Sequence, residues 1–133
     1  MLNKLYSNIN FLQKALNGLS LRHEAISNNI ANVNTPDYKK VEVEFEKHLK
    51  DSLDEKSVQL ITTNNKHISN PLRNFSPLIK RDKSTSTRKD GNNVNIDVEM
   101  ANLAKNTIMY NAIIRQVSDE FNKIKTVLRE GGK

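Results

Sequence analysis

Hydrophobic residues recur at alternating steps of three and four near both ends of the chain and are sparse between them. Near the N-terminus the recurring positions are Leu2, Leu5, Ile9, Leu12, Leu16, Leu19, Ile26, Ile30 and Val33, with His23 at one polar position. Near the C-terminus they are Met100, Leu103, Tyr110, Ile114, Val117, Phe121, Ile124 and Leu128, with Thr107 at the polar position. This spacing is that of the a and d positions of a coiled coil, which need a partner helix along their whole length. The pattern predicts a mainly α-helical chain in which helices within residues 1–33 and 96–133 pair as an antiparallel coiled coil.

Residues that favour helix ends mark the limits of both predicted helices. Asn34-Thr35-Pro36 should end the first helix, because the residue before a proline is disfavoured in the α region. Asn95 or Asp97 should cap the second helix, and Gly131-Gly132 should stop it. Asn17-Gly18 could instead form a turn within the first helix, but the a/d spacing continues unbroken across it and favours one continuous helix.

Residues 34–95 show no sustained periodicity and are predicted to form an irregular middle segment, partly extended or disordered, with short strand or helical pieces. Alternation of Val41, Val43 and Phe45 with charged residues gives a weak strand signal over residues 38–45. Phe45 and Leu49 begin a spacing of four that indicates a short amphipathic helix over residues 45–55. From residue 57 to 90, two prolines and many Asn, Ser and Thr residues exclude long regular elements.

Composition narrows the class of protein. The chain carries a net charge of +6, which is spread along its length, and it has no cysteine or tryptophan. The sharpest basic run, from Lys80 to Lys89, lies among serines and threonines and is predicted to be a solvated loop, which disfavours nucleic-acid binding. No apolar run is long enough to predict membrane insertion. The first residues also lack the basic and apolar blocks of a secretory signal peptide.

No pattern indicates catalysis or a bound cofactor. Glu42, Glu44 and Glu46 lie among lysines on a mostly solvated stretch, which favours a salt-bridged surface over a general acid–base pair. No two histidines have the spacing of metal ligands on a helix, and motifs for phosphate, dinucleotide or nucleophile-elbow sites are lacking. We therefore expect a protein that is not an enzyme and that has no metal and no cofactor.

Several polar residues on the predicted helices admit two interpretations. An asparagine cluster ends the first helix and comprises Asn28, Asn29, Asn32 and Asn34. These amides either form hydrogen bonds between copies of the chain or simply reflect its Asn-rich composition. His23 either sets the register of the coiled coil or, as we favour, is tolerated at a loosely packed position. Thr107 and Tyr110 either mark a contact between copies, or Tyr110 buries its ring and hydrates its hydroxyl group.

The most specific feature of the sequence is the segment from Leu21 to Lys39, which reads LRHEAISNNIANVNTPDYK. It resembles the N-terminal signature of the bacterial flagellar rod and hook proteins, in which a helix ends in Ile-Ser-x-Asn-Ile-Ala-Asn-x-x-Thr-Pro-x-Tyr-Lys. A second segment, from Asp90 to Asn106, is similar to the sequence that opens the C-terminal helix of proximal-rod members of this family. Many members have glycine where this chain has Asp37. Aspartate tolerates left-handed backbone better than most residues, so the turn should be kept.

This resemblance implies a structural subunit of the flagellar proximal rod, which assembles helically into the axial drive shaft between the membrane ring and the distal rod and hook. It implies export by the flagellar type III apparatus without a cleaved signal peptide, and a place in the periplasmic part of the basal body. The implied partners are other copies of the chain, FlgC-like, FlgF-like and FlgG-like rod subunits, and FliE with the base of the membrane ring. No nucleic acid is among them.

The residues expected to make assembly contacts occupy the a/d positions and the turn after the first helix. They are Leu12, Leu16, Leu19, Ile26, Asn29, Ile30, Asn32, Val33, Asn34, Thr35, Pro36, Tyr38, Met100, Leu103, Tyr110, Ile114, Val117, Phe121 and Ile124. Two alternatives to a rod subunit remain open from the residues alone. One is a stand-alone coiled-coil adaptor or secretion-system needle component, and the less favoured one is a helical nucleic-acid-binding protein.

Overall fold

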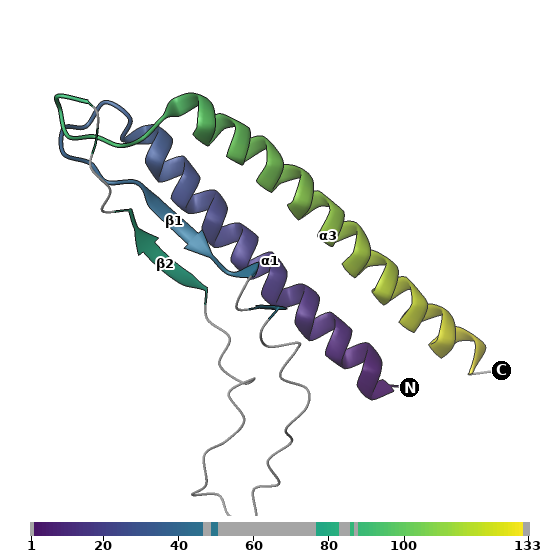
Figure 1. The fold of residues 1–133 in the computed structure, drawn as a ribbon. Helices are drawn as coiled ribbons and strands as arrows, with labels where there is room; N and C mark the ends of the chain where they lie inside the picture. The colour runs from purple at the N-terminus through teal and green to yellow at the C-terminus, as the bar shows by residue number, and fades with distance from the viewer. Residues whose placement is uncertain (1, 47–48, 51–76, 83–85, 87, 132–133) are drawn as a thin grey trace, which may run out of the picture.

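The computed structural model describes residues 2–46, 49–50, 77–82, 86 and 88–131. In chain order the elements are helix α1 (Leu2–Ala31), strand β1 (Val41–Glu44), strand β2 (Leu78–Arg81) and helix α3 (Ile96–Glu130). Figure 1 shows α1 and α3 side by side with the two chain termini at the same end, so the helices are antiparallel. The predicted fold class, mainly helical with two long terminal helices paired against each other, is confirmed.

Helix α1 runs unbroken through Gly18, as the continuous a/d spacing predicts. Glycine at this position costs about 1 kcal/mol of helix propensity relative to alanine. The structure shows what the glycine allows, because a Cβ atom there would lie 2.6 Å from ring atoms of Phe45. The buried Phe45 ring therefore lies directly on the helix backbone, and a side chain at residue 18 would displace it.

The turn after α1 has the left-handed backbone expected at Asp37. Its φ angle is 58°, and Gly91 has a φ angle of 72°. The N–H group of Asp37 donates a hydrogen bond of 2.8 Å to the Asp90 carbonyl oxygen. The turn after α1 is thus joined to the loop that leads into α3.

Strands β1 and β2 form a two-stranded antiparallel sheet, with Val41 opposite Arg81 and Val43 opposite Ile79. β1 lies beside α1, and β2 lies on the outer side of β1 (Figure 1). The strand predicted within residues 38–45 is confirmed as β1. The expectation that the whole basic run from Lys80 to Lys89 forms a loop is wrong for its first two residues. Lys80 and Arg81 belong to β2 and pair with β1. The backbone bonds to β1 hold these two residues extended.

A helical hydrogen bond of 2.8 Å, from the Leu49 N–H to the Phe45 carbonyl, lies at the start of the short helix expected over residues 45–55. The rest of that predicted helix and most of residues 57–90 lie outside the described residues. Among those described, no helix has both the length and the hydrophobicity needed to cross a membrane.

The hydrophobic core lies where α1 meets both β1 and α3. The buried cluster comprises Ala15, Leu19, Ala25, Val43, Phe45 and Leu49, and Met109 and Ile113 of α3 pack against it. Alternate residues of β1 point to one face, so Val43 reaches the core whereas Glu44 is exposed. Helix α1 is therefore the central element, with the sheet on one side and α3 on another.

Candidate assembly interface

Helix α3 turns a partly polar line of residues towards the interior of the protein. This line consists of Glu99, Asn106, Ile113 and Glu120, each seven residues from the next. Glu99, Asn106 and Glu120 are only 1%, 2% and 6% exposed, and Ile113 packs against the core. Each of these residues directly precedes one predicted to face α1. Successive residues are about 100° apart around a helix. The inward face of α3 is shifted from the predicted one by less than this angle, because Leu103, Val117 and Ile124 stay half-buried.

The predicted a/d residues of α3 consequently form an exposed apolar surface, which we call the α3 stripe and define as Met100, Thr107, Tyr110, Ile114 and Phe121. Its four large apolar side chains, of Met100, Tyr110, Ile114 and Phe121, are between 36% and 55% exposed. The expectation that the two sets of a/d residues cover each other is therefore wrong along this line. Of the other predicted α3 residues, Leu103, Val117 and Ile124 are half-buried at the edge of the stripe, and Leu128 is exposed.

A buried asparagine explains why α3 adopts this rotation. The fully buried side chain of Asn29 donates to the Val41 carbonyl at 2.8 Å and to Glu99 Oε2 at 3.0 Å. Its Oδ1 atom accepts hydrogen bonds from the Val41 N–H at 2.9 Å and the Tyr38 hydroxyl at 3.2 Å. Asn29 therefore bonds β1 as a neighbouring strand would and also holds the first turn of α3. The Asn29 amide is thus used within the chain, and hydrogen bonds between copies from the asparagine cluster stay a prediction.

A second buried asparagine closes the C-terminal end of α1. The side chain of Asn92 donates to the carbonyl oxygens of Asn32, Val33 and Thr35 at 2.9, 3.0 and 2.9 Å. Its Oδ1 atom accepts from the Val94 N–H at 2.8 Å. The last carbonyl groups of a helix and of the turn that follows have no partner within the helix. Asn92 supplies donors to them from a segment about sixty residues further along the chain.

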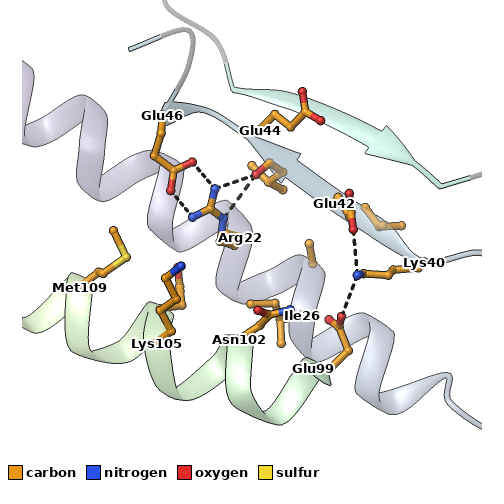
Figure 2. Close-up of a pocket in the computed structure, with 14 residues that line it drawn as sticks. Arg22, Ile26, Lys40, Glu42, Glu44, Glu46, Glu99, Asn102, Lys105 and Met109 are labelled. Carbon is orange, nitrogen blue, oxygen red and sulfur yellow. Dashed lines mark hydrogen bonds and ion pairs between the residues drawn. The ribbon is translucent and has the colours of Figure 1, made fainter. Parts of the chain in front are cut away.

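Figure 2 shows the charged groups between β1, α1 and α3. The Lys40 ammonium lies 2.8 Å from Glu42 and 3.3 Å from Glu99. Burial opposes the charged form of Lys40, but the two carboxylates outweigh it and raise the pKa of Lys40 above its ordinary value. The buried carboxylate of Glu99 thus has a nearby cation in addition to the Asn29 amide.

Arg22 of α1 holds the far end of β1. Its guanidinium donates to both carboxylate oxygens of Glu46 and, at 2.9 Å, to the Val43 carbonyl oxygen. The same group lies over the Phe45 ring, 4.6 Å from its centre, a favourable cation–π distance. The hydrogen bonds from Arg22 lower the pKa of Glu46. Arg22 and Asn29 between them bond the backbone edge of β1 that faces α1.

The predicted residues of α1 and its turn fall into three groups. Leu12, Leu19, Ile26 and Asn29 are buried; Leu16, Ile30, Asn32, Val33 and Tyr38 are half-buried; and Asn34, Thr35 and Pro36 are exposed. His23 is exposed, so it does not lie in the contact between the helices. Figure 1 shows the turn at the end of the helix pair opposite to the termini, where its exposed residues are available to a neighbour.

Sequence reasoning missed the polar residues that hold the elements together. Neither Asn92 nor Asn106 is among the predicted contact residues. The Asn106 side chain donates a 3.0 Å hydrogen bond to the Leu19 carbonyl of α1. The sequence carried no distinguishing signal for them. Glu99, Asn106 and Glu120 recur with heptad spacing beside the apolar positions, and polar residues there are also typical of a solvated coiled-coil flank.

Two paired terminal helices, one of which carries an uncovered apolar stripe, define an elongated structural subunit. Among the described residues no group of His, Asp or Glu side chains could hold a metal ion. The family model described as "Flagella basal body rod protein" matches residues 9–39. That range covers most of α1 and the whole turn to Lys39.

Curated relatives match nearly the whole chain. The chain is 40% identical to the flagellar basal body rod protein FlgB of Bacillus subtilis over 92% of both proteins. It is 31% identical to FlgB of Borreliella burgdorferi, with 96% of this chain and 100% of the relative covered. It is 34% identical to FlgB of Buchnera aphidicola subsp. Baizongia pistaciae, with 97% and 99% covered.

The chain belongs to the FlgB family of flagellar basal body rod proteins and is a structural subunit of the flagellar rod. This membership disfavours the adaptor, needle and nucleic-acid-binding alternatives. The resemblance inferred from the segment Leu21 to Lys39 is confirmed.

Proposed function

We propose that this subunit occupies the proximal rod and joins its neighbours through the α3 stripe, in a helical array that links the membrane ring to the distal rod and hook. The stripe is the observation that carries the proposal. Its four large apolar side chains are each at least one-third exposed and follow one line along a long helix. A contiguous exposed apolar surface of this kind marks a site of protein association.

Two physical properties of the fold support an axial role. A contact between unlike surfaces that does not close into a ring generates an open helical filament. The α3 stripe differs from the surfaces offered by the turn and by the sheet, so contacts between it and another surface are of this unlike type. The two long helices run parallel to one axis (Figure 1) and would transmit torsion along that axis with little bending.

The partners and route follow from the same proposal. The subunit reaches the periplasmic part of the basal body through the flagellar type III export apparatus. There it contacts FlgC-like, FlgF-like and FlgG-like subunits on the distal side, and FliE with the membrane-ring base on the proximal side. The exposed turn residues Asn34, Thr35 and Pro36 and the α3 stripe are the surfaces proposed for these contacts.

The test is to place a charge on the stripe without disturbing the fold. Ile114 is 40% exposed, so Ile114→Asp should leave the helix content and unfolding midpoint of the purified protein almost unchanged. It should prevent assembled rods and motility in cells that depend on this chain. Gln116→Asp is the matched control, because residue 116 is exposed on another side of the same helix. Cells that carry this variant should swim normally.

Ile26→Asp separates folding from assembly. Ile26 is 5% exposed, so this variant should unfold and lose motility for a different reason, visible as lost helical circular dichroism. Normal motility with a well-folded Ile114→Asp subunit built into rods would contradict the proposal. Loss of motility with Gln116→Asp as severe as with Ile114→Asp would also contradict it.

A further inference from the structure

A groove of about 310 Å³ lies between β1, α1 and α3 (Figure 2). Ile26 of α1 and Met109 of α3 give it apolar surface, and Asn102 of α3 also lines it. Its ionisable lining consists of the carboxylates of Glu42, Glu44, Glu46 and Glu99 and the cations of Arg22, Lys40 and Lys105. The carboxylates outnumber the cations, so the groove is slightly acidic on a chain whose net charge is +6.

Two buried acceptor atoms of the groove lining receive no hydrogen bond in the described part of the chain. They are Oε1 of Glu99 and Oδ1 of Asn106. The Lys40 ammonium lies 3.3 Å from Glu99 Oε1 and forms an ion pair with it. Asn106 uses its nitrogen to bond the Leu19 carbonyl, which leaves its oxygen as the free atom. A buried acceptor without a donor is unfavourable, so Asn106 Oδ1 indicates a ligand that brings a donor, and Glu99 Oε1 beside it can accept a hydrogen bond in addition to its ion pair with Lys40.

The chemistry of the lining selects a cationic side chain. Lysine and arginine carry donors and no acceptor, so they satisfy both oxygens without adding an unpaired acceptor of their own. An arginine also has an aliphatic stem, which can pack on Ile26 and Met109 while the guanidinium reaches the polar atoms. A net negative lining favours such a group over a neutral amide.

The chain itself presents a segment with this character in strand β2. All four residues of β2 are exposed, and Ile79 is 59% exposed. Alternate residues of a strand share a face, so Ile79 and Arg81 present one apolar and one cationic side chain together. Leu78 and Lys80 lie on the opposite face, where Lys80 is 3.8 Å from Glu44 of the same chain.

We propose that Arg81 of a second copy of this chain enters the groove, with Ile79 beside it, and donates hydrogen bonds to Glu99 and Asn106. The contact joins two different surfaces and therefore continues from copy to copy. The inference rests on the proposed function, since it names one contact by which copies would assemble.

Disulfide formation between copies tests the contact. The chain has no cysteine, so single-cysteine variants report only the pair introduced. An equimolar mixture of Ile79→Cys and Asn102→Cys should give a disulfide-linked dimer under mild oxidation when the protein is assembled. A mixture of Leu78→Cys and Asn102→Cys is the matched control, because Leu78 is also exposed but faces the other way, and it should give far less dimer.

A further substitution tests the role of the guanidinium. Arg81→Ala in the Ile79→Cys protein should lower the dimer yield and raise the concentration for half-maximal assembly about 10- to 100-fold, the range expected for loss of hydrogen bonds to a charged donor. Arg81→Lys should retain much of the contact. Sedimentation of each mixture measures assembly independently of the disulfide.

Each outcome decides between the two proposals. Assembly with equal dimer yields for Ile79→Cys and Leu78→Cys, or with only background yield for both, would mean that the groove holds water or another partner, and would overturn the inference while leaving the proposed function in place. A protein that stays monomeric at every concentration, with no cross-link, would overturn the self-association on which both depend.

Discussion

Replacing Asn92 should separate the C-terminal end of α1 from the loop before α3, which the Asn92 side chain joins. Asn92→Ala removes the donors to the Asn32, Val33 and Thr35 carbonyls and the acceptor for the Val94 N–H. The residue is 0% exposed, so water cannot replace these partners without local opening. The expected result is loss of order at the C-terminal end of α1 and in the loop before α3.

The expected loss of stability follows from the number of hydrogen bonds that Asn92 makes. The amide group has two donor hydrogens, which are shared among the three carbonyls, and one bonded acceptor. Each buried hydrogen bond contributes about 1 kcal/mol net, and each group left unpaired costs about 1–3 kcal/mol. The free energy of unfolding should fall by about 3 kcal/mol. That is a large part of the roughly 5–15 kcal/mol typical of a folded domain.

Urea unfolding followed by helical circular dichroism measures the change in midpoint and slope. Substitutions at two other asparagines give reference values for this stability change. Asn95 caps α3 from an exposed position, so Asn95→Ala should cost about 1 kcal/mol. Asn111 is exposed on α3, so Asn111→Ala should change stability by less than about 0.5 kcal/mol. An Asn92→Ala protein as stable as Asn111→Ala would refute the assigned role of Asn92.

Two further predictions concern the contact between α1 and β1. Gly18→Ala should destabilise the protein by about 1–3 kcal/mol in thermal unfolding despite alanine's better helix propensity, because the new methyl group overlaps the Phe45 ring; a raised melting temperature would show that the ring moves freely aside. The hydrogen bonds from Arg22 lower the pKa of Glu46 below 4.5, so the pair's contribution is present above pH 4.5 and is lost as the pH falls through the lowered pKa. Glu46→Gln should therefore reduce the difference in urea midpoint between pH 7 and pH 3. An unchanged difference would argue that this ion pair, like many exposed ion pairs, contributes nothing to stability.

Local chemistry in the sequence determined the helices and their ends. The a/d spacing predicted two long paired helices, and its continuity across Gly18 predicted one unbroken α1. Asn95, one of the two candidates, caps α3 with side-chain bonds to the backbone of Asp97 and Val98, and Asp37 adopts the left-handed turn. These features depend on residues a few positions apart, so a single sequence contains the information that decides them.

The tertiary structure decided which face of α3 meets α1, where β2 pairs, and what closes the end of α1. Asn29 bonds Glu99 across seventy positions, Asn106 bonds Leu19 across eighty-seven, and Asn92 reaches the turn after α1. A periodic pattern shows which residues are apolar but not what covers them. Exposed apolar area on α3 can be covered by a neighbouring subunit, whereas a buried amide or carboxylate needs a partner within the fold. The polar contacts therefore set the rotation of α3, and that rotation leaves its apolar stripe on the surface.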